Sequence, residues 1–267
     1  MIGLKAKLRN SLDYYRFHLP ILRNLLDTFE LNDYEYAIVG GFVRCVTAYH
    51  LLKSDELHDI DIVVDIDTQE LEYIFSHYHI KYQKNDFGGY KIFDNTGTFN
   101  MYIDIWCLSN HQPFKAFPEK YHNWKGITES SWLTVCGGVY LPQTNKVYIK
   151  GLKRAIRKHQ VTLRHPEIYF ESKNIINKYT IVAKLIDYSL YYKLDINCLK
   201  AIAEYLAKHK DNKTLVNYLE SHSSRFVIDW NKLIDDDFRV LNDFDVFPVD
   251  SKYTFWPPVD PNHTPLG

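Results

Sequence analysis

The sequence lacks the features that mark several large classes of protein. Its four cysteines, in a chain of 267 residues, are far apart and none belongs to a CxxC pair. That spacing argues against a cysteine-based zinc site and against a disulfide scaffold. No apolar run reaches the roughly 18 residues that a transmembrane helix needs, and the N-terminal residues contain no apolar core of a signal peptide. We therefore expect a soluble, cytoplasmic protein that makes no use of a membrane.

The chain also lacks an excess of charge of either sign. It has 32 Lys and Arg against 33 Asp and Glu, a net charge of −1, so binding to nucleic acid would require a local basic patch. Hydrophobic residues make up 46% of the chain, as in ordinary folded proteins. A chain of this length can build one large core, or a main domain with a smaller partner.

Periodicity divides the chain into four parts. Residues 1–33 have helical spacing, with Pro20 marking a break or a second helix start. Residues 34–150 alternate between helix and strand patterns, and residues 151–222 show helical periodicity alone. Residues 223–267 form an acidic and aromatic tail suited to a protein partner or a homo-oligomer contact. We expect an α+β fold, in which a small mixed sheet flanked by helices precedes an all-α region.

Acidic residues interrupt two apolar strands of the α/β part. Residues Asp59 and Asp61 lie two apart in "DIDIVVD", so both side chains emerge on one face, roughly 6–7 Å apart at Cα. Asp104 stands between Ile103 and Ile105 in "YIDIW", and it would join them if the two strands are neighbours. Carboxylates this close repel one another unless a cation lies between them. The pattern predicts a magnesium site, with Mn²⁺ as the alternative ion.

A double glycine precedes the first acidic strand. Gly40 and Gly41 end the apolar run "YAIV", and a helical pattern containing Arg44 follows. A glycine turn at a helix start allows backbone N–H groups to approach a phosphate, and an arginine one turn later can bind it with two donors. We expect these three residues to bind a phosphate group.

Together these motifs resemble those of a known family. "IVGGFVRC…HDIDIVVD" resembles the head of the class II CCA-adding enzymes and bacterial poly(A) polymerases, in the DNA polymerase β-like nucleotidyltransferase superfamily. Their first motif reads GGxVRD, and DxD follows on the next strand. "FGGYKIF…MYIDIW" is similar to the next two strands, and "YFESKNIINKYTIVAKLIDYSL" to the helical neck. The resemblance covers about residues 34 to 205.

The sequence departs from the family pattern at three places. Cys45 stands where the family has the aspartate of VRD, and "WKG" at Trp124–Gly126 replaces the RRD triplet. The base-reading groups of the neck would fall within Lys173–Lys178, where the chain reads "KNIINK". We expect the transfer chemistry to be retained and the choice of nucleotide to differ.

The resemblance implies template-independent transfer of a nucleoside monophosphate from an NTP, ATP or CTP, to an RNA 3′ hydroxyl, with tRNA as a candidate acceptor. Asp59, Asp61 and Asp104 would be the catalytic residues and would hold two Mg²⁺ ions. Gly40, Gly41 and Arg44 would bind the triphosphate of the nucleotide. A local basic patch agrees with an RNA substrate. On a helix, four of its members share one face: Lys150, Arg154, Arg157 and Lys158.

Two other functions remain open at this point. The same chemistry could act on a hydroxyl of a protein side chain or of a small molecule. Alternatively, a degenerate nucleotidyltransferase head could serve as a binding or structural module, although the complete set of three acids argues against this.

Overall fold

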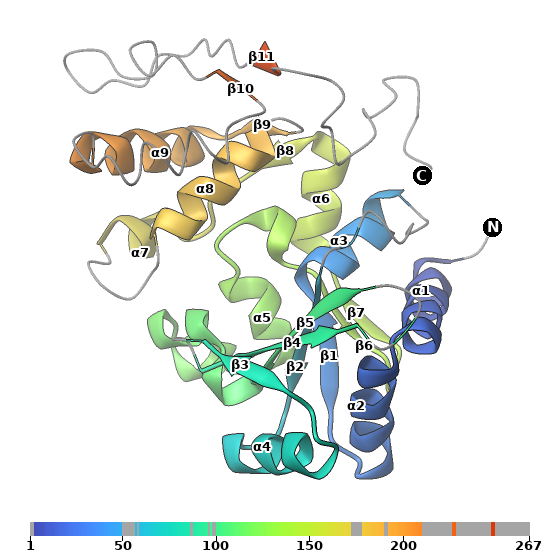
Figure 1. Ribbon diagram of the computed structural model, residues 1–267. Helices are drawn as coiled ribbons and strands as arrows, with labels where there is room; N and C mark the ends of the chain where they lie inside the picture. Colours follow the sequence, from blue (N-terminus) through green and yellow to red (C-terminus); the bar gives the residue numbers. More distant parts are fainter. Residues whose placement is uncertain are drawn as a thin grey trace. The chain divides into compact units, whose positions relative to one another are not determined.

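Figure 1 shows the chain as a computed structural model. The chain divides into two compact units. The first unit comprises Met1–Ser131 and Val135–Arg154, and the second comprises Trp132–Thr134 and Ala155–Gly267. The residues described are 3–49, 57, 59–85, 88–95, 97, 100–171, 178–189, 192–209, 226–227 and 247–248.

A seven-stranded sheet organises the first unit. Its strands lie in the order β3-β4-β5-β2-β1-β6-β7. All neighbouring pairs are antiparallel except β2 and β5, which are parallel. The strands are β1 (Tyr36–Val39), β2 (Asp59–Val64), β3 (Tyr82–Lys84), β4 (Tyr90–Asp94), β5 (Met101–Cys107), β6 (Val139–Leu141) and β7 (Lys146–Tyr148).

Helices and short 3-10 turns connect these strands. The helices are α1 (Leu4–His18), α2 (Pro20–Leu31), α3 (Gly40–Tyr49), α4 (Thr68–His77) and α5 (Trp124–Ser130). Helix α6 (Lys150–Lys158) begins in the first unit and ends in the second. The 3-10 turns are η1 (Leu108–Asn110), η2 (Gln112–Ala116), η3 (Glu119–Tyr121) and η4 (Thr134–Cys136).

One face of the sheet is covered by helices. Phe29 of α2 packs against Tyr36 of β1, with ring centroids 5.7 Å apart, and Phe75 of α4 packs against Tyr90 of β4 at 5.2 Å. The central residues of this face are isoleucines with 0% exposure: Ile60, Ile62, Ile103 and Ile105. These positions alternate with the acids along β2 and β5, so burial of the isoleucines directs the acids to the opposite face.

The buried carboxylate of Asp94 fixes α2 to the sheet. Asp94 ends β4 and has 0% exposure. Its Oδ2 accepts hydrogen bonds from the backbone N–H groups of Ile21 at 2.7 Å and Leu22 at 3.1 Å. These donors belong to the first turn of a helix, where no intrahelical acceptor exists. A side chain 73 residues away in sequence therefore caps α2.

The opposite face of the sheet is covered only in part. A hydrophobic cluster there joins the sheet to α5 and the 3-10 turns through Ala37, Val39, Val63, Leu108, Phe114, Ile127, Val139 and Leu141. Trp106 of β5 packs against this cluster, and its indole N–H donates to His111 Nδ1 at 3.3 Å. Burial, helped by the charge of His122, lowers the pKa of His111 to about 3. His111 is therefore neutral near pH 7 and can accept this bond.

The second unit is mainly helical in the part that the structure describes. Its helices are α7 (Pro166–Glu171), α8 (Lys178–Ser189) and α9 (Ile196–His209). Two pairs of two-residue strands accompany them, β8 (Gln160–Val161) with β9 (Lys193–Leu194), and β10 (Phe226–Val227) with β11 (Phe247–Pro248). Helices α8 and α9 lie where the periodicity predicts them, whereas α7 and the short strands were not expected. The helix predicted near residues 212–222 lies outside the described residues.

The prediction of an α+β fold is confirmed. The sheet has seven strands and is therefore larger than the small mixed sheet that was expected. The helix break at Pro20 and the strands β1, β2, β4 and β5 lie where the sequence places them. Strand β3 and helix α5 were not predicted. Among the residues described, no helix is both long enough and apolar enough to cross a membrane.

Candidate active site

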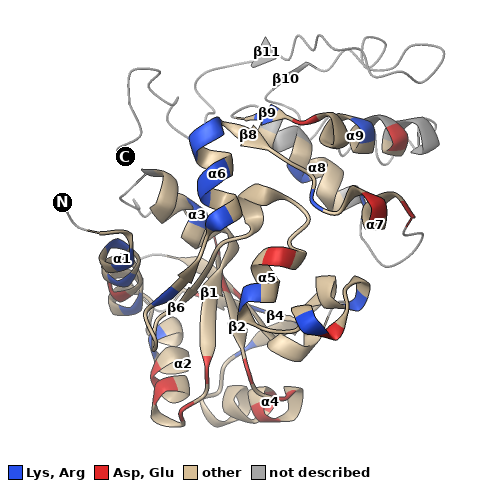
Figure 2. Ribbon diagram, turned by 180° about the vertical axis from the view of Figure 1, so that it is seen from behind, with Lys and Arg blue, Asp and Glu red and all other residues tan. Residues whose placement is uncertain are grey.

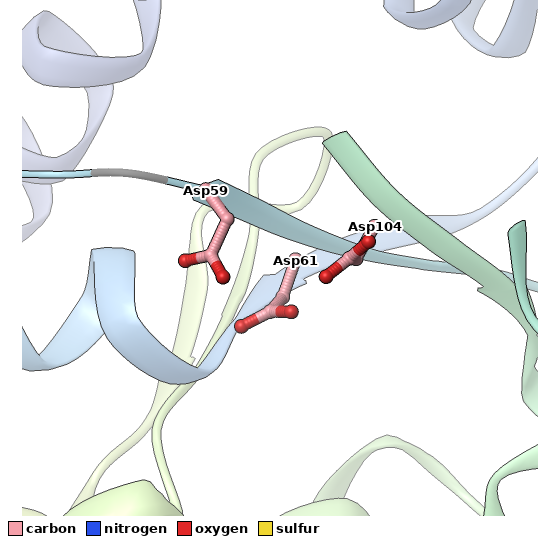
Figure 3. Close-up of side chains that lie close together, drawn as sticks. All are labelled: Asp59, Asp61 and Asp104. Atoms are coloured by element: carbon pink, nitrogen blue, oxygen red, sulfur yellow. The ribbon is translucent and has the colours of Figure 1, made fainter. Parts of the chain in front are cut away.

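The register between two parallel strands brings the acids together. Asp61 of β2 is paired with Asp104 of β5, and Asp59 is paired with Tyr102. One oxygen from each of Asp59, Asp61 and Asp104 lies within 4.8 Å of the others. Figure 3 shows the three carboxylates gathered on the same side of the strands. The predicted convergence of these side chains is therefore present in the structure.

The electrostatics of this group favour a bound cation. All three carboxylates are half-buried, where their mutual repulsion is screened less than in bulk water. The Nζ atom of Lys91 lies 3.7 Å from Asp104 Oδ2, so this ammonium offsets part of the negative charge. Oxygen ligands of this kind suit Mg²⁺ or Mn²⁺ and not softer metals. The residues present therefore fit a site for hard divalent ions.

The glycine turn lies directly beside the acids. Gly40 follows Val39, which is paired with Asp61, and its φ of +62° is a conformation that glycine adopts without strain. A Cβ atom at Gly40 would lie 2.5 Å from Asp61 Oδ2. Hence glycine is required here both for the sharp entry into α3 and for the position of the Asp61 carboxylate.

Arg44 and Gly41 belong to the same neighbourhood. A Cβ atom at Gly41 would lie 3.7 Å from Arg44 Nη2 and 3.9 Å from Asp59 Oδ1. The first turn of α3, its arginine and the acids are thus grouped as the sequence predicts. The first N–H groups of a helix have no intrahelical acceptor, and the helix end carries partial positive charge. This edge of the site is therefore suited to phosphate.

Two of the departures from the family pattern have structural roles. Cys45 is 1% exposed, so its side chain belongs to the core. Trp124 and Lys125 open α5, where the Trp124 indole donates to Glu35 Oε2 at 2.9 Å and Lys125 forms an ion pair with Glu129 at 2.9 Å. Both side chains are thus engaged in contacts within the first unit.

The predicted basic patch forms an exposed face of α6, which is coloured blue in Figure 2. Lys150, Arg154, Arg157 and Lys158 are all exposed, while Leu152 and Ala155 are buried on the other side. No carboxylate of the described part of the chain forms an ion pair with any of the four. Their positive charge is therefore available to a phosphate backbone.

Other predicted features fall outside the described residues. Of Lys173–Lys178, only Lys178 is described, and its Nζ lies 5.0 Å from the ring centroid of Tyr169. The tail 223–267 is described only at β10 and β11.

Sequence reasoning missed Lys91. It occupies an exposed position of β4 between the buried Tyr90 and Ile92, and it is paired with Asp104 across the strands. The alternation along "YKIF" indicates that Lys91 and Phe93 share a face, but only the register shows which acid they meet.

Solved structures of similar fold agree with this arrangement. A CCA-adding enzyme in complex with CTP matches 80% of this chain, with a TM-score of 0.51 and 15% identity, and 54% of its own length is covered. A CCA-adding enzyme in complex with ATP matches 79% of this chain with a TM-score of 0.53, 19% identity and 48% of its length covered. The chain has the fold of the CCA-adding enzymes.

A third structure, a tRNA nucleotidyltransferase complexed with a primer tRNA and an incoming ATP analogue, matches 79% of this chain. It has a TM-score of 0.50 and 16% identity, and 56% of its length is covered. The chain thus spans about half the length of the solved structures that it matches. No family model matches the sequence, and no curated protein does.

We predict that Asp59→Asn and Asp61→Asn leave the melting temperature in EDTA unchanged or raise it, because each removes one of three repelling charges. Saturating Mn²⁺ or Mg²⁺ should stabilise the wild type, by about 2.7 kcal/mol at a hundredfold excess over Kd, and should stabilise these variants less. Differential scanning fluorimetry measures both the melting temperature in EDTA and its increase on addition of the metal ion. Asp65→Asn, an exposed acid just beyond β2, is the matched control. A lower melting temperature of the variants in EDTA would instead identify the acids as structural.

We also predict that Gly40→Ala destabilises the protein by about 1–2 kcal/mol, the cost of a left-handed conformation in a residue with a Cβ. It should also weaken the stabilisation by Mn²⁺, because the new methyl group displaces the Asp61 carboxylate. Gly41→Ala is the control, since its Cβ would make only ordinary contacts. Equal Mn²⁺ responses in the two variants would contradict the link between Gly40 and the metal site.

Proposed function

We propose that this chain is a template-independent nucleotidyltransferase that transfers a nucleoside monophosphate from an NTP to an RNA 3′ hydroxyl. The observation that carries the proposal is the convergence of Asp59, Asp61 and Asp104 beside a glycine turn and an arginine. Three acids alone would make only a cation site. Their position against the start of a helix adds a place for the triphosphate.

Each part of the site has a role in this reaction. The acceptor oxygen forms a bond to the α-phosphorus, the bond from that phosphorus to the oxygen bridging it to the β-phosphate breaks, and the hydroxyl proton passes to solvent. Pyrophosphate is the leaving group. Asp59, Asp61 and Asp104 would hold two divalent ions, which when bound favour ionisation of the acceptor hydroxyl and offset phosphate charge. The Gly40–Gly41 turn and Arg44 would hold and orient the triphosphate, since a guanidinium can donate two hydrogen bonds to one phosphate group.

An RNA acceptor is supported by α6 and by the relatives. The exposed Lys150, Arg154, Arg157 and Lys158 form a surface for a phosphate backbone. The similar structures include complexes with CTP, with ATP and with a primer tRNA, so ATP and CTP are the first nucleotides to test and tRNA is the first acceptor. By the resemblance, the family's base-reading residues would fall near Lys173–Lys178, where the sequence reads "KNIINK", and this favours a changed choice of nucleotide.

The test is transfer of label from each of the four α-³²P-labelled nucleoside triphosphates to total RNA in the presence of Mg²⁺. We expect labelled RNA with the wild type and with Asp65→Asn, and none with the double variant Asp59→Asn and Asp61→Asn. Labelled protein without labelled RNA would establish the same chemistry on a protein hydroxyl. Absence of any transfer would contradict the proposal and favour a binding module.

A further inference from the structure

The sheet face that carries the acids continues onto β4. Lys91 of β4 is paired with Asp104, and Phe93 is paired with Tyr102 of β5. Tyr102 is in turn paired with Asp59 of β2. The two aromatic side chains therefore lie on the same face as the acids, in one row with Asp59 and one row away from Asp61 and Asp104.

These two rings are exposed although they lie within the sheet. Phe93 is 43% and Tyr102 is 44% exposed, whereas Ile92 and Ile103 beside them are fully buried. The ring centroids lie 4.9 Å apart at an interplanar angle of 37°, so they form one apolar surface. Trp106, on the same face, is partly buried and packs against the hydrophobic cluster, which accounts for its position.

Lys91 connects this surface to the acids. Its Nζ lies 4.8 Å from the ring centroid of Tyr102 and 3.7 Å from Asp104 Oδ2. A cross-strand aromatic pair stabilises its two strands without a cation beside it. Stabilisation of the sheet therefore does not explain why Lys91 lies between the rings and the acids. Two exposed rings and an ammonium group have the composition of a surface that binds a nucleobase and its phosphate.

The order of the strands gives this surface a defined place in the reaction. The glycine turn and Arg44 follow β1, the acids lie on β2 and β5, and Lys91 and Phe93 lie on β4, in the sheet order β4-β5-β2-β1. In phosphoryl transfer the attacking and leaving oxygens are roughly in line on opposite sides of the phosphorus. With pyrophosphate on the glycine side, the acceptor approaches from the β4 side.

We propose that Lys91, Phe93 and Tyr102 bind the unpaired 3′-terminal nucleotides of a polynucleotide acceptor. The rings stack on a terminal base, and Lys91 contacts a neighbouring phosphodiester. Tyr102 is two residues from Asp104, roughly 7 Å at Cα, a distance that a single nucleotide spans. Stacking requires an exposed base face and accepts any base. This site therefore selects single-stranded ends with little sequence preference, and it rests on the proposed function.

The kinetic test uses Tyr102→Leu and Phe93→Leu, with Tyr102→Phe as the conservative variant. Phe17→Leu is the matched control, because Phe17 is a 75% exposed aromatic residue of α1. We expect each leucine variant to raise the KM for a single-stranded RNA acceptor about tenfold, since a stacked base contributes that order of affinity. Kcat and the KM for the NTP should stay within about twofold of the wild type, and Tyr102→Phe should restore the acceptor KM.

Binding without catalysis gives an independent test. Fluorescence anisotropy of labelled oligoadenylate, in EDTA and without NTP, should show weaker binding by Tyr102→Leu and Phe93→Leu but not by Phe17→Leu. For Lys91→Met, the slope of log affinity against log salt should become shallower by about 0.7, the value for one phosphate contact on a single strand. The melting temperatures of all variants establish that the fold is intact.

The outcomes separate this proposal from the proposed function. If the wild type transfers nucleotides and the leucine variants keep its acceptor KM, the aromatic surface is not the acceptor site. A wild type that transfers nothing contradicts the proposed function, and the anisotropy then decides this proposal: loss of oligoadenylate binding in the leucine variants supports it. Three results would overturn the acceptor-site proposal. They are equal oligoadenylate binding by all variants, a preference for a fully paired end, and transfer to protein that the variants do not affect.

Discussion

Mutual repulsion between three carboxylates is the constraint on which the rest of the first unit depends. Asp59, Asp61 and Asp104 are held with their oxygens within 4.8 Å of one another, an arrangement that burial of the alternate isoleucines enforces. Helices α2 and α4 cover the isoleucine face. Because side chains alternate along a strand, an acid could move to the covered face only if the isoleucines moved to the acidic face. The hydrophobic core therefore holds the acids in place and supplies the free energy that opposes their repulsion.

The parallel pairing of β2 with β5 brings the three acids together into one site. An antiparallel neighbour can follow after a short turn, but a parallel one requires a crossover connection, here through α4, β3 and β4. This connection places Lys91 and the Phe93–Tyr102 pair on one side of the acids. The antiparallel β1 places Gly40 and Arg44 on the other. The order of strands thus gives the site two chemically different sides, one suited to phosphate and one to an aromatic ligand.

Much of this arrangement could be predicted from sequence because period-2 alternation is strong in β2 and β5, where aspartates interrupt Ile and Val. The glycine turn was equally clear, since "GG" separates a strand pattern from a helix pattern. Strand β3 was missed because all three of its residues are exposed, which leaves no alternation to detect. Helix α5 was missed because it is short and contains glycine and β-branched residues. The contacts of Lys91 and Phe93 depend on the register between β4 and β5, which local pattern does not determine.

The central claim is that the three acids hold divalent ions between the triphosphate and the acceptor. The most direct measurement is anomalous diffraction from crystals grown with Mn²⁺ and a nucleoside triphosphate analogue that cannot be cleaved at the α-phosphate. We predict anomalous peaks bound by Asp59, Asp61 and Asp104, with the triphosphate lying against Gly40, Gly41 and Arg44. A nucleotide bound elsewhere, or the absence of an anomalous peak between these carboxylates, would contradict the account.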